Sequence, residues 1–140
     1  MIDKEQISIM IRDIEGYLSD LGAMDISSKE DFEEKETYYA VSMIIFQIMN
    51  RTIDIGNEVI SGSSDILLPG SYKEAFEILS EKKVLSPKTA SKMTNLMKYR
   101  NAIAHEYYRI TADEIYRLKN DVYEVEDFVE EIKKYVARKT

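Results

Sequence analysis

The side chains best suited to chemistry in this sequence lie between Arg100 and Arg109. The segment reads RNAIAHEYYR, which places a guanidinium, an amide, an imidazole and two phenols within ten residues. His105 is the only histidine of the chain, and imidazole is the side chain that gives or takes a proton most readily near neutral pH. A lone histidine is usually structural, but these neighbours favour acid–base chemistry supported by a fixed positive charge.

The spacing of these residues limits how they can meet. Asn101 and His105 are four residues apart and share one face of a helix, whereas Arg100 and His105 are separated by about 140° around the helix axis. In one regular helix Arg100 and His105 therefore point apart. Either the turn is distorted, or the two groups meet across an interface with a second copy of the chain.

A second group of polar residues lies on an otherwise apolar helix. From Tyr38 to Met49 ten of twelve residues are apolar, which predicts a central helix buried nearly all round. Polar residues at spacings of three and four continue along this helix and form what we call the polar line, whose members are given below. One interpretation of the polar line is a strip that faces solvent. The other is that Asp54, with Gln47 or Asn50, orients Arg100 or His105 from the adjacent helix. The polar line consists of Gln47, Asn50, Arg51, Asp54 and Glu58.

The charge is unevenly distributed along the chain. Nineteen Lys and Arg against 26 Asp and Glu give a net charge of −7, which argues against a protein that coats nucleic acid indiscriminately. The window from Lys82 to Arg109 nevertheless carries +6, while the other residues sum to −13. This window is either a solvated helix face or a region that attracts an anion.

Apolar residues at helical spacing and capping motifs predict an all-α protein. Four long amphipathic helices and a short third one pack most simply as an antiparallel up-and-down four-helix bundle with one additional short helix, in a single domain over residues 1–140. The first two helices are expected over residues 4–21 and 28–60. The other three begin at the caps Ser71, Ser86-Pro87 and Thr111, and the last of them runs to near the C-terminus.

Several kinds of site are excluded by the residues present. Without cysteine there is no thiol nucleophile, thiolate zinc site or disulfide. No Glu-x-x-His, GxxxxGK[ST], GxGxxG or HExxH pattern occurs, so we expect no metal and no cofactor. No apolar run approaches the roughly 20 residues of a membrane span, and we expect a soluble, cytoplasmic protein without a membrane partner.

The segment from Arg100 to Tyr107 has the form R-x4-H-x-Y, with Asn directly after Arg. This resembles the signature of HEPN-superfamily ribonucleases, and is most similar to the HepT-like toxins of prokaryotic toxin–antitoxin pairs. The resemblance extends over roughly residues 5 to 130 and includes Gln47 and Asp54, a loop ending in Pro69 and the segment 71–76. It implies a homodimer in which the Arg and His of both protomers line one cleft and cut RNA without metal.

The resemblance also implies a partner, a minimal nucleotidyltransferase antitoxin encoded next door that attaches AMP to the motif tyrosine, here Tyr107. The AMP would fill the cleft and add negative charge beside Arg100. In this hypothesis His105 is the general acid and base, and Arg100 stabilises charge on the scissile phosphate. The supporting residues are Asn101 and Asp54 for positioning, Lys92, Lys98 and Arg109 for the RNA backbone, and Tyr107 or Tyr108 for stacking on a base.

Two other functions stay open from the sequence. One is a non-catalytic HEPN module that binds nucleotide or partners a nucleotidyltransferase, and the other is a bare structural bundle. The intact set of Arg100, His105 and Tyr107 favours the ribonuclease, since a binding module has no need of an imidazole beside a phenol. An RNA cleavage assay separates the ribonuclease from the binding module, and an adjacent nucleotidyltransferase gene separates it from the structural bundle.

Overall fold

The computed structural model of the protein describes residues 2–62, 69–106 and 110–139, except for the side chains of residues 105 and 106. These ranges contain helices and connections and no β-strand. The α-helices are α1 (Lys4–Ala23), α2 (Lys35–Ser61), α3 (Tyr72–Glu81), α4 (Pro87–Met97), α5 (Arg100–Glu106), α6 (Ala112–Asp121) and α7 (Val125–Arg138), and the 3-10 turns are η1 (Lys29–Glu33) and η3 (Val122–Glu124).

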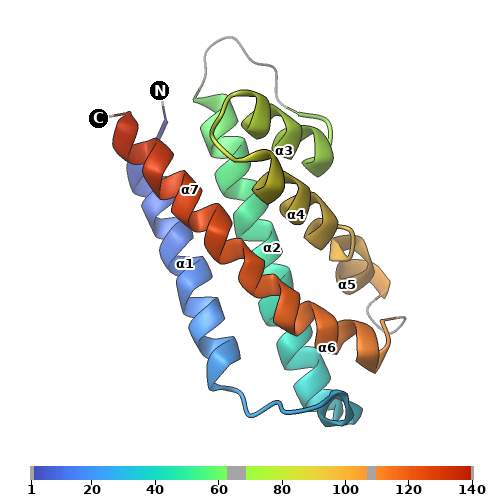
Figure 1. The fold of residues 1–140 in the computed structure, drawn as a ribbon. Coiled ribbons are helices and arrows are strands. Elements are labelled where there is room, and N and C mark those ends of the chain that lie inside the picture. The colour runs from blue at the N-terminus through green and yellow to red at the C-terminus, as the bar shows by residue number, and fades with distance from the viewer. Residues whose placement is uncertain (1, 63–68, 107–109, 140) are drawn as a thin grey trace.

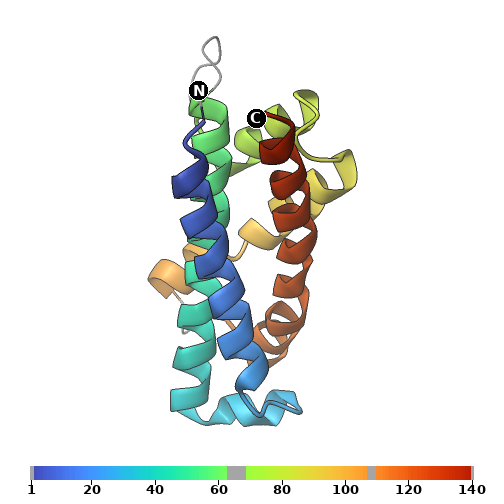
Figure 2. The ribbon, with the colours of Figure 1, turned by 90° about the vertical axis from the view of Figure 1, so that its left-hand side faces the viewer.

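The helices form the predicted antiparallel bundle. Four long segments run along one axis in alternating directions: α1, α2, α4 followed by α5, and α6 followed by α7 (Figure 1). The short helix α3 lies at the end that also holds both termini, and η1 lies at the opposite end (Figures 1 and 2). The prediction of an all-α four-helix bundle with one additional short helix is therefore confirmed.

One apolar core joins all of these segments. Phe76 of α3 meets Phe128 of α7 edge to face, with ring centroids 6.3 Å apart, so that the short helix is tied to the last long one. Within the described residues no helix is both long enough and apolar enough to cross a membrane. The side chains at the centre of the core include Ile14, Ile45, Ile48, Met49, Ile55, Met93, Ile115, Val125 and Ile132.

The apolar helix α2 is not buried all round, contrary to the sequence-based prediction. The relative solvent exposure of Tyr39 is 49% and that of Met43 is 57%. Both belong to the same apolar run as Val41 and Ile45, which are fully buried. The neighbouring helices cover one side of this run and leave the other open. An apolar strip of α2 therefore stays on the surface.

The capping motifs begin their helices as predicted. The side chains of Ser71, Ser86 and Thr111 each accept a hydrogen bond from the N–H three residues on. Ser28 opens the turn η1, where the N–H groups of Ser27 and Ser28 donate to Asp31. These hydrogen bonds to the ionised carboxyl lower the pKa of Asp31.

Three predicted helices are divided. The helix expected to run from Thr111 to near the C-terminus is interrupted by η3 between α6 and α7, where residues 122–124 form a 3-10 turn. The other two divisions lie earlier in the chain.

The helix expected to open after Ser28 starts as η1 and becomes α-helical only at Lys35, and the helix that opens at Pro87 breaks at residues 98–99 before α5 begins at Arg100. The break at residues 98–99 changes direction: α4 packs against α3 and α7, whereas α5 packs against α2. Hydrophobic periodicity predicts where a helix lies, but it does not predict a break at which the chain changes from one packing partner to another.

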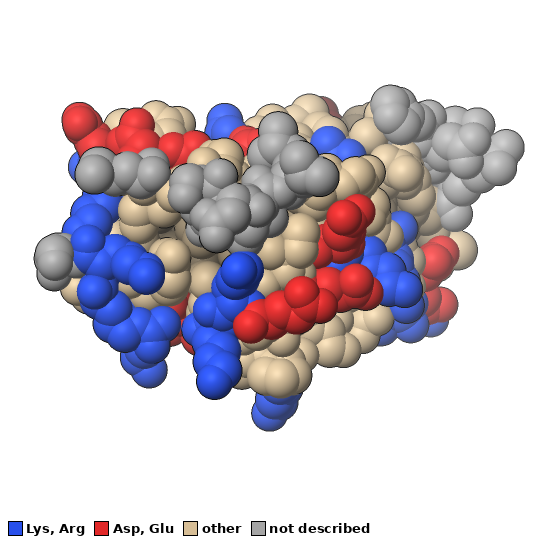
Figure 3. Space-filling view, turned by 90° about the horizontal axis from the view of Figure 1, so that it is seen from above, with Lys and Arg blue, Asp and Glu red and all other residues tan. Residues whose placement is uncertain are grey.

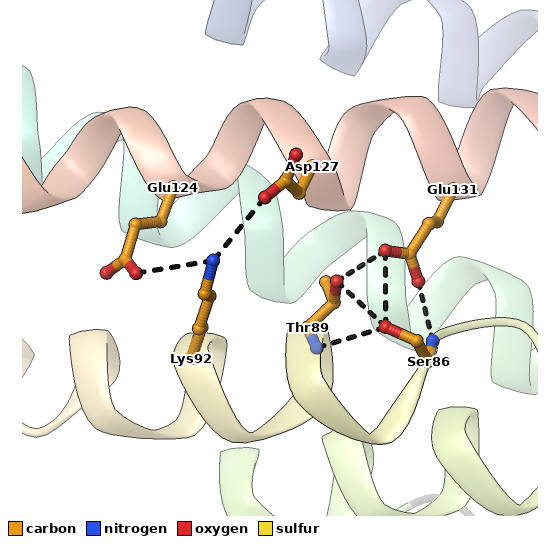
Figure 4. Close-up of polar contacts among 6 residues, drawn as sticks. All are labelled: Ser86, Thr89, Lys92, Glu124, Asp127 and Glu131. Atoms are coloured by element: carbon orange, nitrogen blue, oxygen red, sulfur yellow. Dashed lines mark hydrogen bonds and ion pairs between the residues drawn. The ribbon is translucent and has the colours of Figure 1, made fainter.

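A polar clasp joins the start of α4 to α7 (Figure 4). The backbone N–H of Ser86 donates to Glu131 Oε1 at 2.6 Å, and the hydroxyls of Ser86 and Thr89 both reach Glu131 Oε2. One turn further along α4, Lys92 Nζ lies 3.8 Å from Glu124 and 3.6 Å from Asp127. The carboxylate of Glu131 thus caps a helix from 45 residues away.

We expect Glu131→Ala to lower the free energy of unfolding by about 1–3 kcal/mol, because it leaves the backbone N–H of Ser86 and the buried hydroxyl of Thr89 without their carboxylate acceptor. Glu130→Ala is the matched control, since the Glu130 carboxylate contacts only Lys133, at 4.0 Å, among the described residues. Urea unfolding of both variants measures the difference. Equal stability of the two variants would show that the clasp contributes nothing.

Candidate functional site

Arg100 is the first residue of α5 and is held against α2. Its Nε donates to Asn50 Oδ1 at 2.8 Å, and its Cζ lies 5.7 Å from the centroid of the Phe46 ring. Among the described residues, the two terminal nitrogens of the guanidinium have no hydrogen-bond or ion-pair partner. The guanidinium is thus fixed on one edge and open on the other, where its N–H groups can bind a phosphate in bidentate fashion.

The structure does not bring Asp54 to Arg100. Asp54 instead accepts a hydrogen bond from Arg51 at 2.7 Å, and Asp13 of α1 lies 3.3 Å from the Nε of the same arginine. Asn50 and Asp54 are one helical turn apart on α2, and only Asn50 lies level with the start of α5. Of the polar residues proposed to orient Arg100, the structure therefore selects Asn50.

The backbone of α5 narrows the choice about how Arg100 and His105 meet. The break in the chain lies at residues 98–99, and α5 is one helix from Arg100 to Glu106. The two positions therefore keep their separation of about 140° around the axis. The backbone shows no distorted turn between them, and the interface with a second copy stays a prediction.

The other predicted site residues are placed as follows. Asn101 is exposed on α5, and Lys98 is exposed at the end of α4. Lys92 faces the carboxylates of Glu124 in η3 and Asp127 in α7 (Figure 4), and its role in RNA binding stays a prediction. The side chain of His105 and the whole of Tyr107, Tyr108 and Arg109 lie outside the described residues.

An open apolar hollow of about 260 Å³ lies beside Arg100, between α2 and α5. Met43 and Tyr39 form its exposed rim, and the buried hydroxyl of Ser42 has no hydrogen-bond partner among the described residues. The sequence did contain a signal for this hollow, because an apolar run on all sides of a helix needs more cover than a four-helix bundle supplies. It is lined by Tyr39, Ser42, Met43, Phe46, Ile103 and Ala104.

Metal ligands do not gather at this site or elsewhere in the described part of the chain. No group of three or more His, Asp or Glu side chains there is arranged to hold a metal ion. The chemistry that the described side chains offer at the site is hydrogen bonding and positive charge from Arg100, together with the apolar surface of α2.

The protein is an all-α bundle in which Arg100 and His105 lie on one short helix with the spacing R-x4-H. It is a ribonuclease-type HEPN protein. The family model described as Ribonuclease HepT-like matches residues 7–132, and the chain belongs to this family.

Two comparisons with individual proteins agree. The chain is similar to a Bacillus subtilis protein named "Putative RNase YutE", with 28% identity over 110 residues that cover 78% of this chain and 76% of that protein. It also resembles the solved structure of YutE from Bacillus subtilis, titled as a cytosolic protein of unknown function. That comparison has a TM-score of 0.84 and 25% identity, and covers 99% of this chain and 93% of the other.

Proposed function

We propose that this protein is a metal-independent endoribonuclease that acts as a homodimer. The observation that carries the proposal is the state of Arg100: Asn50 and Phe46 hold one edge of its guanidinium, while the edge that can bind phosphate has no partner among the described residues. The only histidine of the chain lies five residues further on the same helix. Membership of the HepT-like ribonuclease family supports the assignment of RNA as substrate.

The proposed reaction is a transesterification at phosphorus. A base takes the proton of the ribose 2′-hydroxyl, the 2′-oxygen bonds to phosphorus, and the bond from phosphorus to the 5′-oxygen breaks as an acid donates a proton to that oxygen. The products are a 2′,3′-cyclic phosphate and a 5′-hydroxyl. Arg100 stabilises the negative charge that builds on the phosphorane oxygens.

The homodimer supplies the two imidazoles that this reaction uses. Each chain has a single His105, so the base and the acid come from different copies. The exposed rim of Met43 and Tyr39 lies beside Arg100 and offers an apolar surface for the second copy. A second copy bound to this surface would place its own α5 beside α5 of the first copy. Arg100 of one copy could then face His105 of the other, although the two point apart within one helix.

The proposed biological role is that of a toxin, neutralised by a nucleotidyltransferase antitoxin that transfers AMP to Tyr107. The resemblance to HepT-like toxins motivates this role. Tyr107 is two residues from His105 in the sequence, so an added phosphate would place negative charge and bulk close to the acid–base group. Intact mass of the protein made with and without its genomic neighbour tests it, because each transfer adds the mass of one AMP group.

The test of the nuclease assignment is cleavage of labelled single-stranded RNA by the purified protein in the presence of EDTA. We expect cleavage to be unaffected by the chelator and to leave 2′,3′-cyclic phosphate ends. Cleavage that disappears with EDTA would contradict metal independence. Binding of RNA without any cleavage would instead favour the non-catalytic HEPN module.

The contact between Asn50 and Arg100 gives a further prediction. We expect Asn50→Ala to lower kcat by about tenfold to a hundredfold, because a guanidinium displaced by about 1 Å no longer meets the phosphorane oxygens. Asn50→Asp keeps the acceptor oxygen and should retain more activity than Asn50→Ala. Asn57→Ala, the same change further along α2, is the control and should leave kcat unchanged. A loss of kcat that Asn50→Asp and Asn57→Ala share would point to general damage to α2.

A further inference from the structure

Basic side chains gather at the end of the bundle that holds α3 and both termini. Figure 3 looks onto this end and shows Lys and Arg side chains over the C-terminal part of α7 and over the connection from α3 to α4. Six exposed cations of these segments and of the first turn of α4 have no acidic partner among the described residues, and we call them the basic cluster. They are Lys82, Lys83, Lys88, Lys134, Arg138 and Lys139.

The clasp at Glu131 holds the two halves of the basic cluster together. Ser86, which bonds to Glu131, lies within four residues of Lys82, Lys83 and Lys88. On α7, Lys134 and Arg138 follow Glu131 at spacings of three and seven residues, and therefore continue the same face of the helix. Cations that are about 50 residues apart in the sequence thus meet at one end of the fold.

The cations of the basic cluster form no ion pairs within the described structure, whereas Lys29, Lys92 and Lys133 each have acidic partners. Arg138 and Lys139 lie 5.9 and 5.3 Å from the Tyr135 ring, which holds them without cancelling their charge.

The carboxylate of Glu131, which lies between the two halves of the cluster, is occupied by Ser86 and Thr89. Glu81, which precedes Lys82, forms no ion pair with that lysine among the described residues.

A stretch of chain without Asp or Glu leads from the basic cluster to Arg100. Residues 85–105 contain no Asp or Glu, in a protein that has 26 of them among 140 residues. Glu77 and Glu81 of α3 nevertheless border the same surface hollow as one side of α4, and Glu124 and Asp127 contact Lys92 on another side. The stretch includes α4, which has 11 residues and is about 16 Å long. Lys88 lies at its start, and the exposed Lys98 lies at its end next to Arg100.

We propose that the basic cluster binds backbone phosphates of the RNA at a distance of about one α4 length from the phosphate that is cut. This inference rests on the proposed ribonuclease function and adds a second contact region for the same substrate. RNA fits better than an acidic protein segment, because one strand with a phosphate at every nucleotide can contact Arg100 and Lys98 at one end of α4 and the basic cluster at the other. Contacts of Lys with phosphate carry no base preference, so the cluster holds the strand without selecting its sequence.

A contact region distant from the reacting phosphate has a characteristic kinetic effect. It binds the ground state and the transition state of the RNA equally, so its loss raises KM and leaves kcat at saturation unchanged. It also makes affinity depend on salt, because each phosphate contact releases bound counterions.

The experiment compares two triple variants that remove the same number of charges. Lys82→Gln with Lys88→Gln and Lys134→Gln removes half of the basic cluster. Lys29→Gln with Lys35→Gln and Lys119→Gln removes three cations near the opposite end, around η1, α6 and the start of α2. The measurements are KM and kcat for cleavage of a long single-stranded RNA, and binding of that RNA by fluorescence anisotropy at several salt concentrations in the His105→Ala background.

The cluster variant should bind RNA roughly tenfold more weakly at low salt, with KM raised in proportion and kcat unchanged. Its salt slope should fall by about 2, as expected for three lost contacts to a single strand. The control variant should match the parent. Equal KM and equal salt slope in the two variants would overturn the inference while leaving the nuclease intact, and would favour an acidic protein as the partner of this end. Absence of cleavage by the parent protein would instead refute the proposed function.

Discussion

Replacing His105 with alanine is expected to lower kcat for RNA cleavage by about 10²–10⁴-fold while RNA affinity is retained. The reason is that His105 is the only imidazole of the chain, and imidazole is the side chain whose ordinary pKa lies closest to neutral pH. Cleavage rates under saturating RNA measure the effect, and an unchanged unfolding midpoint shows that the fold survives. Wild-type cleavage by a folded His105→Ala protein would refute the assignment.

Mixtures of wild-type and His105→Ala chains test whether each active centre uses two imidazoles. If one histidine acts as base and its copy in the partner acts as acid, only dimers of two wild-type chains are active. After subunit exchange in an equal mixture, about a quarter of dimers have two wild-type chains, and activity should fall to about that fraction. Activity near half would show that each protomer works alone.

If the protein is the proposed dimer, Met43→Glu is expected to convert it to a monomer and to lower RNA cleavage in proportion to the fraction of dimer that is lost. Met43 is the most exposed large apolar side chain of the described residues and lies on the rim beside Arg100. A carboxylate at that position would lose its hydration when a second copy covers it, and none of the residues that line the hollow is basic. Because Arg100 lies beside the rim and could pair with the new carboxylate, the mass of the variant, and not its cleavage rate alone, decides the outcome. Light scattering gives the mass, and the RNA assay gives the rate.

Ile9→Glu is the matched control for Met43→Glu. Ile9 is also a partly exposed apolar residue, at 39%, but it lies on α1 and does not line the hollow. This variant should remain dimeric and active. If Met43→Glu behaves like Ile9→Glu, the second copy does not sit on the strip of α2, and the explanation for how Arg100 and His105 meet must be sought on another surface.

The site was only partly predictable from sequence, and the residues around Arg100 show why. Arg100 and His105 are five residues apart, and in a helix this spacing fixes the angle between them around the axis. The sequence alone therefore predicts that the two side chains point in different directions. The partner of Arg100 comes from α2, 50 residues earlier. The polar line on α2 offered Asn50 and Asp54 as candidate partners. The position along α2 at which α5 packs decides that Asn50 is the residue that contacts Arg100.

What the sequence alone determined is local. The helices, their caps at Ser71, Ser86 and Thr111, the bundle class and the R-x4-H segment follow from periodicity, capping chemistry and residue type, which act within a few positions of the chain. Tertiary packing decided the break before Arg100, the partnership with Asn50, the open apolar strip at Met43, and the union of two basic segments by Glu131. Each of these depends on which surfaces distant helices present to one another, and that is settled by how a single core is filled rather than by any local pattern.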